Sequence, residues 1–461
     1  MLNQLLMPEI EELIRANDFD ELREALVLFE PAEIAALIEQ LAEVEAALVF
    51  EALPPDRAAD VFEHLPHGDQ AALAEEMADE SDRLAALLNE LSPDDRTAFL
   101  GDLEPAVVQE LLGLLDPDER EVAERLLGYA EDSVGRLVTT DFVAVRPEWT
   151  VEQAFRQIRR YGRDSETINI IYVVDADGKL IDDIRIRDLI LAEPETEVQS
   201  LMDYRYISLN ETDDREEAVR MFRIYDRVAL PVVDGNGLLI GIITHDDVLD
   251  VAEEEATEDI HKLGGSEALD DPYLDTPLPT LIKKRARWLV VLFLGEMLTA
   301  TAMGYFETEI ARAVVLAMFV PLIISSGGNS GSQAASLIIR ALAIGEFGLR
   351  DWWRVMRREL LSGASLGVIL GSVGFLRVLI WANAFGMYGP HWFLIALTVA
   401  LSLVGVVMWG TLTGSMLPLV LKRLGADPAV SSAPFVATLV DVTGLIIYFS
   451  VAALLLTGTL L

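Results

Sequence analysis

The chain has 461 residues, too many for a single domain, and its charge is divided unevenly along its length. Residues 1–280 carry 68 acidic and 22 basic side chains, whereas residues 281–461 carry 8 acidic and 13 basic ones. So acidic a region excludes nucleic acid as a partner and suits multivalent cations. The absence of cysteine excludes disulfides and thiolate metal sites.

Residues 1–130 repeat a short phrase of Leu, a spacer, Pro and acidic residues, which predicts a series of helix starts. Recurrent short helices of this kind stack into a superhelix, so we expect an acidic N-terminal helical domain here. The beginning of the chain lacks the basic segment and long apolar run of a cleaved signal peptide, so this domain is expected to remain in the cytosol. The copies are LPPDR from Leu53, LSPDDR from Leu91 and LDPDER from Leu115, and the looser ones are FEPAEI from Phe29, LPHGDQ from Leu65 and LEPAVV from Leu103.

Residues 131–252 contain two βαβ-like units, in which Val174-Asp175 and Val233-Asp234 lie 59 residues apart. This repeat resembles a tandem pair of CBS modules, folds that commonly bind adenosine nucleotides or act as regulatory hinges. The second copy contains GIITHDDV with Thr244 and Asp247. The first copy has Asp182-Asp183 where the second has Gly241-Ile242, and two charges near a strand expected to be buried favour a hinge over a nucleotide site there.

Residues 253–287 predict a connecting helix followed by a Pro-containing linker, and the rest of the chain, residues 288–461, predicts a membrane domain. Five apolar segments each reach the ~20 residues that cross a bilayer. Basic residues occur before the first segment and in alternate connections after it, which indicates a cytosolic N-terminus and a C-terminus outside. The segments cover roughly residues 288–306, 312–341, 359–381, 392–420 and 432–457.

Two of these spans carry polar chemistry at membrane depth. The second reads FVPLIISSGGNSGSQAASLIIRALA, and its Pro321 and glycines predict backbone carbonyls freed from the helix to line a wet cavity. The alternative is a kinked helix whose small residues allow close packing. In the fifth span Asp441 stands in an otherwise apolar helix, at a cost of about 2.5–3.5 kcal/mol unless it meets water, a cation or a partner such as Arg377. Glu296 in the first span has no motif around it and receives no role.

The segments PLIISSGGNSGSQAASLIIRAL and RLGADPAVSSAPFVATLVDVTG resemble the signature and last span of the MgtE family of magnesium channels. The resemblance covers the whole chain in order: helical domain, CBS pair, connecting plug helix and five spans. It implies a homodimer in a bacterial or archaeal inner membrane, with a pore on the two-fold axis that takes up Mg²⁺. Asp441 matches the family's pore carboxylate, and Asn329 and Gly328 would line the same passage.

The resemblance also implies a sensor, in which Mg²⁺ bridges carboxylates of the cytosolic domains and closes the pore when it is abundant. Facing carboxylates repel one another unless divalent cations neutralise them, and weak oxygen sites fill only at millimolar concentration. Nucleotide is a further expectation, with ATP contacted by Arg187, Asp188 and Asp247. The matching sensor positions are Asp94, Asp95, Asp214, Asp226, Asp247, Asp250, Glu255, Glu258, Asp259 and Asp427.

Two other functions remain open from the residues alone. One is an ion-coupled carrier of Mg²⁺, Mn²⁺ or Co²⁺ that uses Asp441 as its titrating carboxylate and is regulated by adenosine nucleotide at the CBS pair. The other is a nucleotide receptor anchored by its spans, which Asp441 and the GGNSGSQ segment disfavour. An intramembrane enzyme is disfavoured because no acid or His stands in catalytic spacing with Asp441, so no catalytic residue is predicted.

Overall fold

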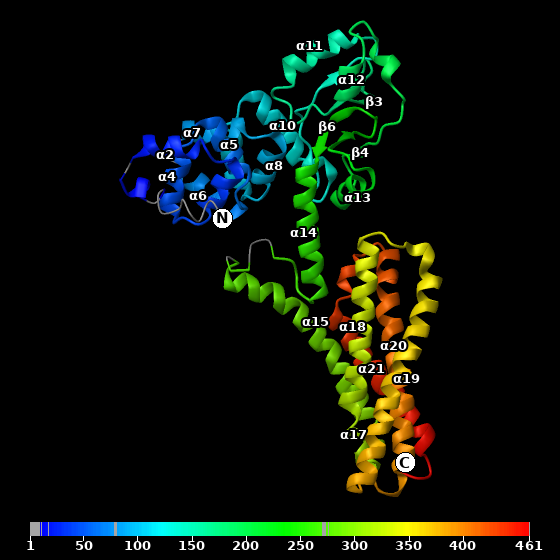
Figure 1. The fold of residues 1–461 in the computed structure, drawn as a ribbon. Coiled ribbons are helices and arrows are strands. Elements are labelled where there is room, and N and C mark those ends of the chain that lie inside the picture. Colours follow the sequence, from blue (N-terminus) through cyan, green and yellow to red (C-terminus); the bar gives the residue numbers. More distant parts are fainter. Residues whose placement is uncertain are drawn as a thin grey trace. The chain divides into compact units, whose positions relative to one another are not determined.

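The computed structural model describes residues 10–460 except 11, 17, 78–80, 270–272 and 275. It consists of two compact units, Met1–Glu253 and Glu254–Leu461 (Figure 1). The first unit combines a helical array with two small sheets, and the second contains the membrane-spanning helices.

Short helices form the first part of the N-terminal unit, and each stacks on helices near it in sequence, so that α3 contacts α5, α5 contacts α7 and α4 contacts α6. The repeated phrase predicted their starts correctly. Helices α3, α5, α8, α9 and α10 begin at Pro31, Pro55, Pro93, Pro105 and Pro117, and α6 follows Pro66. The helices are α2 (Phe19–Leu26), α3 (Pro31–Ile38), α4 (Glu43–Glu51), α5 (Pro55–Glu63), α6 (His67–Glu76), α7 (Ser81–Glu90), α8 (Pro93–Gly101), α9 (Pro105–Leu112) and α10 (Pro117–Leu127).

The second part of this unit holds the two CBS-like modules, each a three-stranded sheet with one parallel and one antiparallel pair. The repeat of 59 residues persists in the register, since Tyr172 pairs with Asp183 and Pro231 pairs with Ile242. The modules contain η1 (Val134–Leu137), β1 (Ala144–Val145), α11 (Val151–Tyr161), β2 (Ile170–Val174), β3 (Leu180–Arg185), α12 (Ile186–Leu191), η2 (Val198–Leu201), β4 (Leu209–Asn210), α13 (Arg215–Tyr225), β5 (Ala229–Val233) and β6 (Leu239–Thr244).

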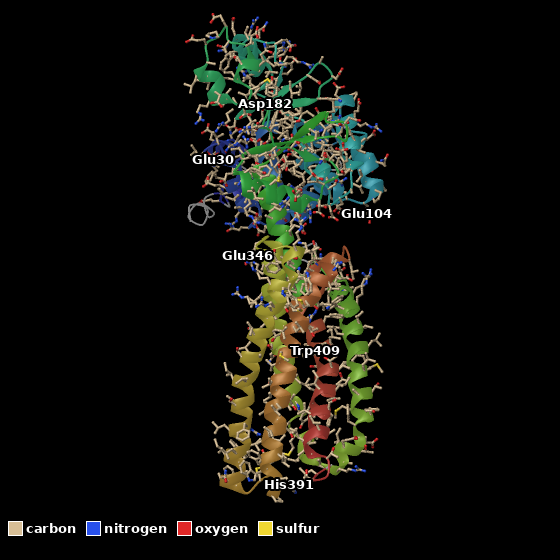
Figure 2. The ribbon with its side chains drawn as sticks, turned by 90° about the vertical axis from the view of Figure 1, so that its right-hand side faces the viewer. Glu30, Glu104, Asp182, Glu346, His391 and Trp409 are labelled. Carbon is tan, nitrogen blue, oxygen red and sulfur yellow. The ribbon has the colours of Figure 1, made fainter. Side chains whose placement is uncertain are left out.

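The two charges on β3, which favoured a hinge over a nucleotide site in the sequence, are both accommodated within the fold of the first module. Asp182 is fully buried, and its carboxylate accepts hydrogen bonds from the backbone N–H groups of Asp183, Asp203 and Tyr204 at 2.9–3.0 Å (Figure 2). Asp183 forms an ion pair with Arg227 at 3.2 Å. A carboxylate with several backbone donors is stable without solvent, so Asp182 fixes the loop that follows η2.

Helix α14 (His245–Leu263) follows β6, and the second unit continues with five candidate membrane spans. The first helix begins at Leu278, about ten residues before the predicted span, because its Lys and Arg residues are good helix formers. The membrane helices are α15 (Leu278–Tyr305), α16 (Glu307–Arg312), α17 (Val314–Ala317), α18 (Val320–Ala343), η3 (Leu349–Asp351), α19 (Trp352–Phe385), η4 (Gly389–His391), α20 (Trp392–Arg423), η5 (Pro428–Val430) and α21 (Ala433–Leu456).

Glycines let α18 and α20 meet backbone to backbone. A Cβ added at Gly410 would lie 2.3 Å from the carbonyl oxygen of Gly327, and one added at Gly414 would lie 2.0 Å from that of Gly331. Both pairs have a four-residue spacing, the arrangement that brings membrane helices into close contact. The expected freed carbonyls are therefore wrong as a description of α18, which is helical throughout with Pro321 in its first turn, where the missing N–H costs no hydrogen bond.

Candidate ion path and acidic clusters

Asp441 lies on α21, where that helix contacts α18. A Cβ added at Gly328 would make van der Waals contact with the Ala437 Cβ at 3.5 Å and with the Asp441 Oδ1 at 3.7 Å, so the carboxylate lies directly beside Gly328. Two hydrogen bonds hold α21 around this point. Ser332 of α18 donates to the Ala433 carbonyl at 3.0 Å, and Trp409 of α20 donates to the Thr443 hydroxyl at 2.9 Å (Figure 2).

A polar stripe runs along α18 beside this carboxylate. Ser325, Asn329, Gln333 and Ser336 are exposed on one face of the helix, while the opposite face buries its glycines and alanines. The Asn329 amide donates to the Ser325 hydroxyl at 3.5 Å. Exposed amides and hydroxyls at membrane depth require water or a protein partner, because hydrocarbon offers them no hydrogen bonds.

Arg377 does not neutralise Asp441. Its guanidinium lies 5.9 Å from the ring centroid of Phe319 and 5.1 Å from that of Trp381. Among the residues that the structure describes, no ion pair joins it to Asp441, so the structural pair considered from the sequence is wrong. A cation over aromatic rings is stabilised by their negative faces instead.

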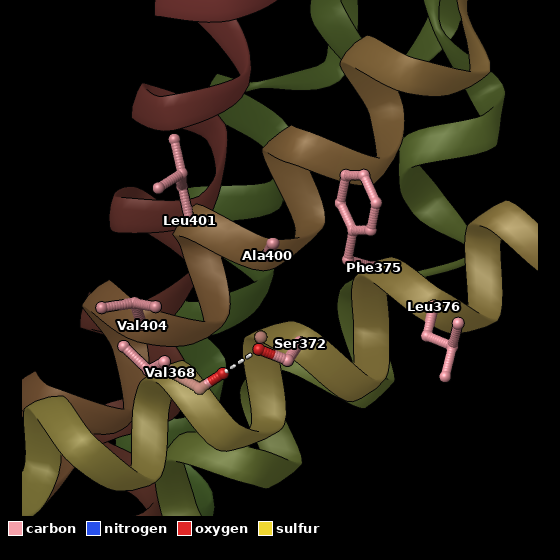
Figure 3. A pocket seen from close by; sticks show the side chains of 8 residues that line it. Val368, Ser372, Phe375, Leu376, Ala400, Leu401 and Val404 are labelled. Atoms are coloured by element: carbon pink, nitrogen blue, oxygen red, sulfur yellow. Dashed lines mark hydrogen bonds between the residues drawn. The ribbon is translucent and has the colours of Figure 1, made fainter.

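The groove between α19 and α20 is not an ion site. It has a volume of about 470 Å³ and apolar walls, and the hydroxyl of Ser372 is already donated to the Val368 carbonyl at 2.7 Å (Figure 3). No charged residue lines it. The other lining residues are Gly371, Phe375, Leu376, Ala400, Leu401 and Val404.

Within the first unit, carboxylates from three helices and one loop converge. Asp94 and Asp95 occupy the first turn of α8, where Ser92 caps the helix and its hydroxyl donates to Asp95 at 2.5 Å. Asp94 is 6% exposed, and its Oδ1 has no hydrogen-bond partner. The cluster has five further carboxylates, whose charges act on Asp94, on Asp95 or on each other. They are Glu63, Glu166, Asp246, Asp247 and Asp250.

Burial and mutual repulsion raise the pKa values of the carboxyl groups in this cluster. Burial raises the pKa of Glu63 to about 8, and Asp95 adds to this. Burial raises the pKa of Asp247 to about 7 against a hydrogen bond from Thr244, and it raises that of Asp94 well above the ordinary value. Burial likewise raises the pKa values of Asp95 and Asp250.

The donor set of the cluster is made of carboxylate oxygens, which suit Mg²⁺. Over the described part of the chain, no three acidic or His side chains are close enough to form a ready metal site. The residues therefore fit an ion that keeps several of its waters, as Mg²⁺ does, better than one that needs direct ligands on every side. Glu63, Glu166 and Asp246 were not predicted as members. No motif surrounds Glu63 or Glu166, and in GIITHDDV the prediction fell on Asp247 and not on its neighbour Asp246.

A second acidic group lies in the second unit, at the end of α14. Lys262 forms ion pairs with Glu258 and, at 2.7 Å, with Asp427 in the loop before α21. Asp259 belongs to the same group, since burial and then the Asp427 charge raise its pKa. Burial opposes the charge of Lys262, but hydrogen bonds from its ammonium to Asp427 and Glu258 raise its pKa. The ammonium group of Lys262 thus already bridges carboxylates that the sequence predicted to be bridged by Mg²⁺.

Asp214 and Asp226 belong to neither group. Asp214 caps α13 by accepting the Glu216 N–H at 2.9 Å, and Asp226 ends the same helix with a positive φ of 48°. The two therefore stand about 18 Å apart along the helix axis, too far to share an ion within one chain. Glu255 lies on α14, three residues before Glu258.

The predicted nucleotide contacts are also separated. Arg187 and Asp188 lie together at the start of α12, with Asp188 3.4 Å from Arg185 and 3.8 Å from Arg187. Asp247 instead belongs to the acidic cluster and accepts the Thr244 hydroxyl at 2.7 Å. The first module thus offers positive charge to phosphates, whereas the second offers negative charge.

Family models match nearly the whole chain in the order expected. The model described as "MgtE intracellular N domain" matches residues 29–132, and the CBS domain matches residues 134–195 and 198–254. The MgtE model, described as "Divalent cation transporter", matches residues 320–451.

Curated relatives agree. The magnesium transporter MgtE of Thermus thermophilus is 46% identical over 353 residues, which are 77% of this chain and 76% of that protein. That of Bacillus subtilis is 32% identical over 366 residues, 79% of each chain.

Two solved structures resemble the soluble part. One is the cytosolic domain of the Mg²⁺ channel MgtE in complex with ATP, with 40% identity, a TM-score of 0.50, and coverage of 53% of this chain and all of that one. The other is the soluble part of a magnesium transporter, with 28% identity, a TM-score of 0.52, and coverage of 55% and 99%.

Proposed function

Because the chain belongs to the MgtE family of magnesium transporters, which are not enzymes, we propose that it is a multi-pass Mg²⁺ uptake channel closed by cytosolic Mg²⁺. The observation that carries the proposal is the position of Asp441. Its carboxylate stands at membrane depth beside the side-chain-free Gly328, the neighbour in sequence of the exposed Asn329, with no basic residue among its described partners.

The pore is proposed to form between two copies of the chain. The polar stripe of α18 and the Asp441 side of α21 must be covered by water or protein, and a two-fold axis next to them supplies both. Two Asp441 carboxylates would then hold Mg²⁺ through its own waters, which suits an ion that loses its waters reluctantly. The basic connections support an orientation with the N-terminus and first unit in the cytosol and the C-terminus outside.

Closure is proposed to come from the acidic groups. Without Mg²⁺, the carboxylates around Asp94 and Asp247 repel one another, and cations that bind between them favour the compact arrangement. Asp226, Asp250, Glu255, Glu258, Asp259 and Asp427 would contribute to the same response. Any conformational shift is limited by the difference in Mg²⁺ affinity between the two states.

Adenosine nucleotide is proposed to bind the first module. Arg187 would meet the phosphates and Asp188 the ribose hydroxyls. The related cytosolic domain solved with ATP supports this proposal, and so does the acidity around Asp247, which repels a triphosphate in the second module.

The test is Mg²⁺ uptake by the full chain in proteoliposomes, with wild type compared with Asp441→Asn and with Asp177→Asn as an exposed control. We expect Asp441→Asn to abolish uptake while the protein remains folded by size-exclusion chromatography. Wild-type uptake should follow the membrane potential in the absence of proton or sodium gradients. Normal uptake by Asp441→Asn would exclude this pore, and a strict need for a proton or sodium gradient would favour the ion-coupled carrier.

A further inference from the structure

Glu296 on α15 is a second carboxylate within the membrane-spanning helices, and nothing in its sequence surroundings gives it a role. It is exposed on the surface of the protomer, as is most of α15. A lone carboxylate facing lipid near the bilayer centre is costly, so such residues almost always face water or a protein interior.

Two contacts fix the depth of Glu296 relative to α21. Near the cytosolic ends of both helices, the Trp288 indole donates to the Ser432 hydroxyl at 3.2 Å. Further along, a Cβ added at Gly295 would lie 2.8 Å from the Thr438 Cγ2, so the helices touch there.

The helical rise then places both carboxylates at one level. Glu296 follows Trp288 by eight residues and Asp441 follows Ser432 by nine, so they lie about 12 and 13.5 Å beyond the shared hydrogen bond. Thr438 and Asp441 are three residues apart and share one face of α21, as Gly295 and Thr299 share one face of α15. The Thr299 hydroxyl is buried without a hydrogen-bond partner, which adds an unused polar group beside Gly295.

We propose that Glu296 faces the ion path at the level of Asp441 and sets how tightly the pore holds the hydrated cation. The inference rests on the proposed channel, in which each protomer would contribute two carboxylates to one level of the path. Two such groups attract a hydrated dication more strongly than one, whereas repulsion between them grows when the ion leaves. Glu296 would thereby govern affinity, while Asp441 remains essential for permeation.

The first test compares Mg²⁺ uptake by the full chain carrying Glu296→Gln, Asp441→Asn or the control Glu307→Gln. We expect Glu296→Gln to retain uptake, to raise the half-saturating Mg²⁺ concentration at least fivefold, and to weaken inhibition by hexaamminecobalt(III), a stable mimic of a hydrated cation, to the same extent. The control should match wild type. Unchanged affinity and inhibition in Glu296→Gln, with uptake abolished in Asp441→Asn, would overturn the role of Glu296 and leave the channel standing. Normal uptake by Asp441→Asn would instead overturn the channel itself.

A second variant decides the question if Glu296→Gln does not fold. The chain has no cysteine, so Glu296→Cys creates a single thiol that can be labelled in water. A cationic methanethiosulfonate reagent should form a disulfide with it and release methanesulfinate, and hexaamminecobalt(III) should slow the reaction. Val373→Cys, on the exposed apolar face of α19, is the matched control and should not react. A folded Glu296→Cys protein that transports Mg²⁺ but does not react would place residue 296 against lipid and overturn the inference.

Discussion

Replacing Asp247 by Asn should stabilise the Mg²⁺-free protein at high pH. The folded state raises the pKa of this carboxyl from 3.8 to about 7, mainly by burial. Between these two pH values the unfolded chain has released the proton that the folded chain still holds, so stability falls as pH rises and the full penalty is present above pH 7. The penalty corresponds to about 4 kcal/mol, a large part of the 5–15 kcal/mol that stabilises a typical domain.

The assay is hydrogen exchange of the full chain, read at the slowest amides of α8 and α14. At pH 8 without Mg²⁺, we expect Asp247→Asn to be protected up to about a thousandfold more than wild type, since each ~1.4 kcal/mol is a factor of ten. At pH 5 most of this difference should disappear. Millimolar Mg²⁺ should protect wild type and have a smaller effect on the variant, which lacks a ligand.

Asp177→Asn is the matched control, because this exposed carboxylate lies in an Asp-Gly turn that Asn-Gly forms equally well. Its exchange should equal that of wild type under each condition. Equal protection of wild type and Asp247→Asn at pH 8 without Mg²⁺ would refute the view that repulsion within the cluster destabilises the empty protein.

Three further predictions concern packing, nucleotide and the Lys262 group. Gly414→Ala should lower the thermal midpoint in detergent sharply, because its Cβ meets a backbone oxygen, whereas Gly304→Ala, which meets nothing, should not. Arg187→Ala should weaken ATP binding at least tenfold in calorimetry, whereas the ATP affinities of Arg163→Ala and Asp247→Asn should remain near that of wild type. If Arg187→Ala binds ATP as tightly as wild type, the first module is better described as a hinge. Lys262→Met should lower the Mg²⁺ concentration for half-closure in single-channel recordings several-fold, and Lys283→Met should not; an unchanged or higher concentration would contradict the role of Lys262.

Local signals explain how much of the fold was predictable. The helix starts at Pro31, Pro93 and Pro117 depend on a few adjacent residues, and the spans depend on continuous apolar runs. The structure of the glycine segment of α18 was harder to predict, because the same residues are compatible with a broken helix that exposes its carbonyls and with close helix packing. The choice depended on Gly410 and Gly414 of another helix, about 80 residues further along the chain.

The sites were predictable only where one element contains them. Asp94, Asp95 and Asp441 stand in recognisable local patterns, but Glu63, Glu166 and Asp246 join the acidic cluster through the fold alone. The misjudged residues share this cause. Two of the three backbone donors of Asp182 come from Asp203 and Tyr204, which lie about 20 residues further along the chain. Arg377, considered as one alternative partner for Asp441, is held by aromatic rings.

The two acidic groups differ in how their charge is balanced, and that difference gives Lys262 its expected effect. The cluster around Asp94 retains protons because burial and repulsion disfavour its ionised form. At Glu258 and Asp427, the ammonium of Lys262 already supplies the attraction that a divalent ion would bring. A cation that binds there must displace Lys262 or share the carboxylates with it, and this weakens binding. A sensor needs weak binding, because a site that is filled at every cellular Mg²⁺ concentration cannot report a change in that concentration. Removing the ammonium leaves the carboxylates facing one another, so Mg²⁺ should bind more tightly and closure should need less of it.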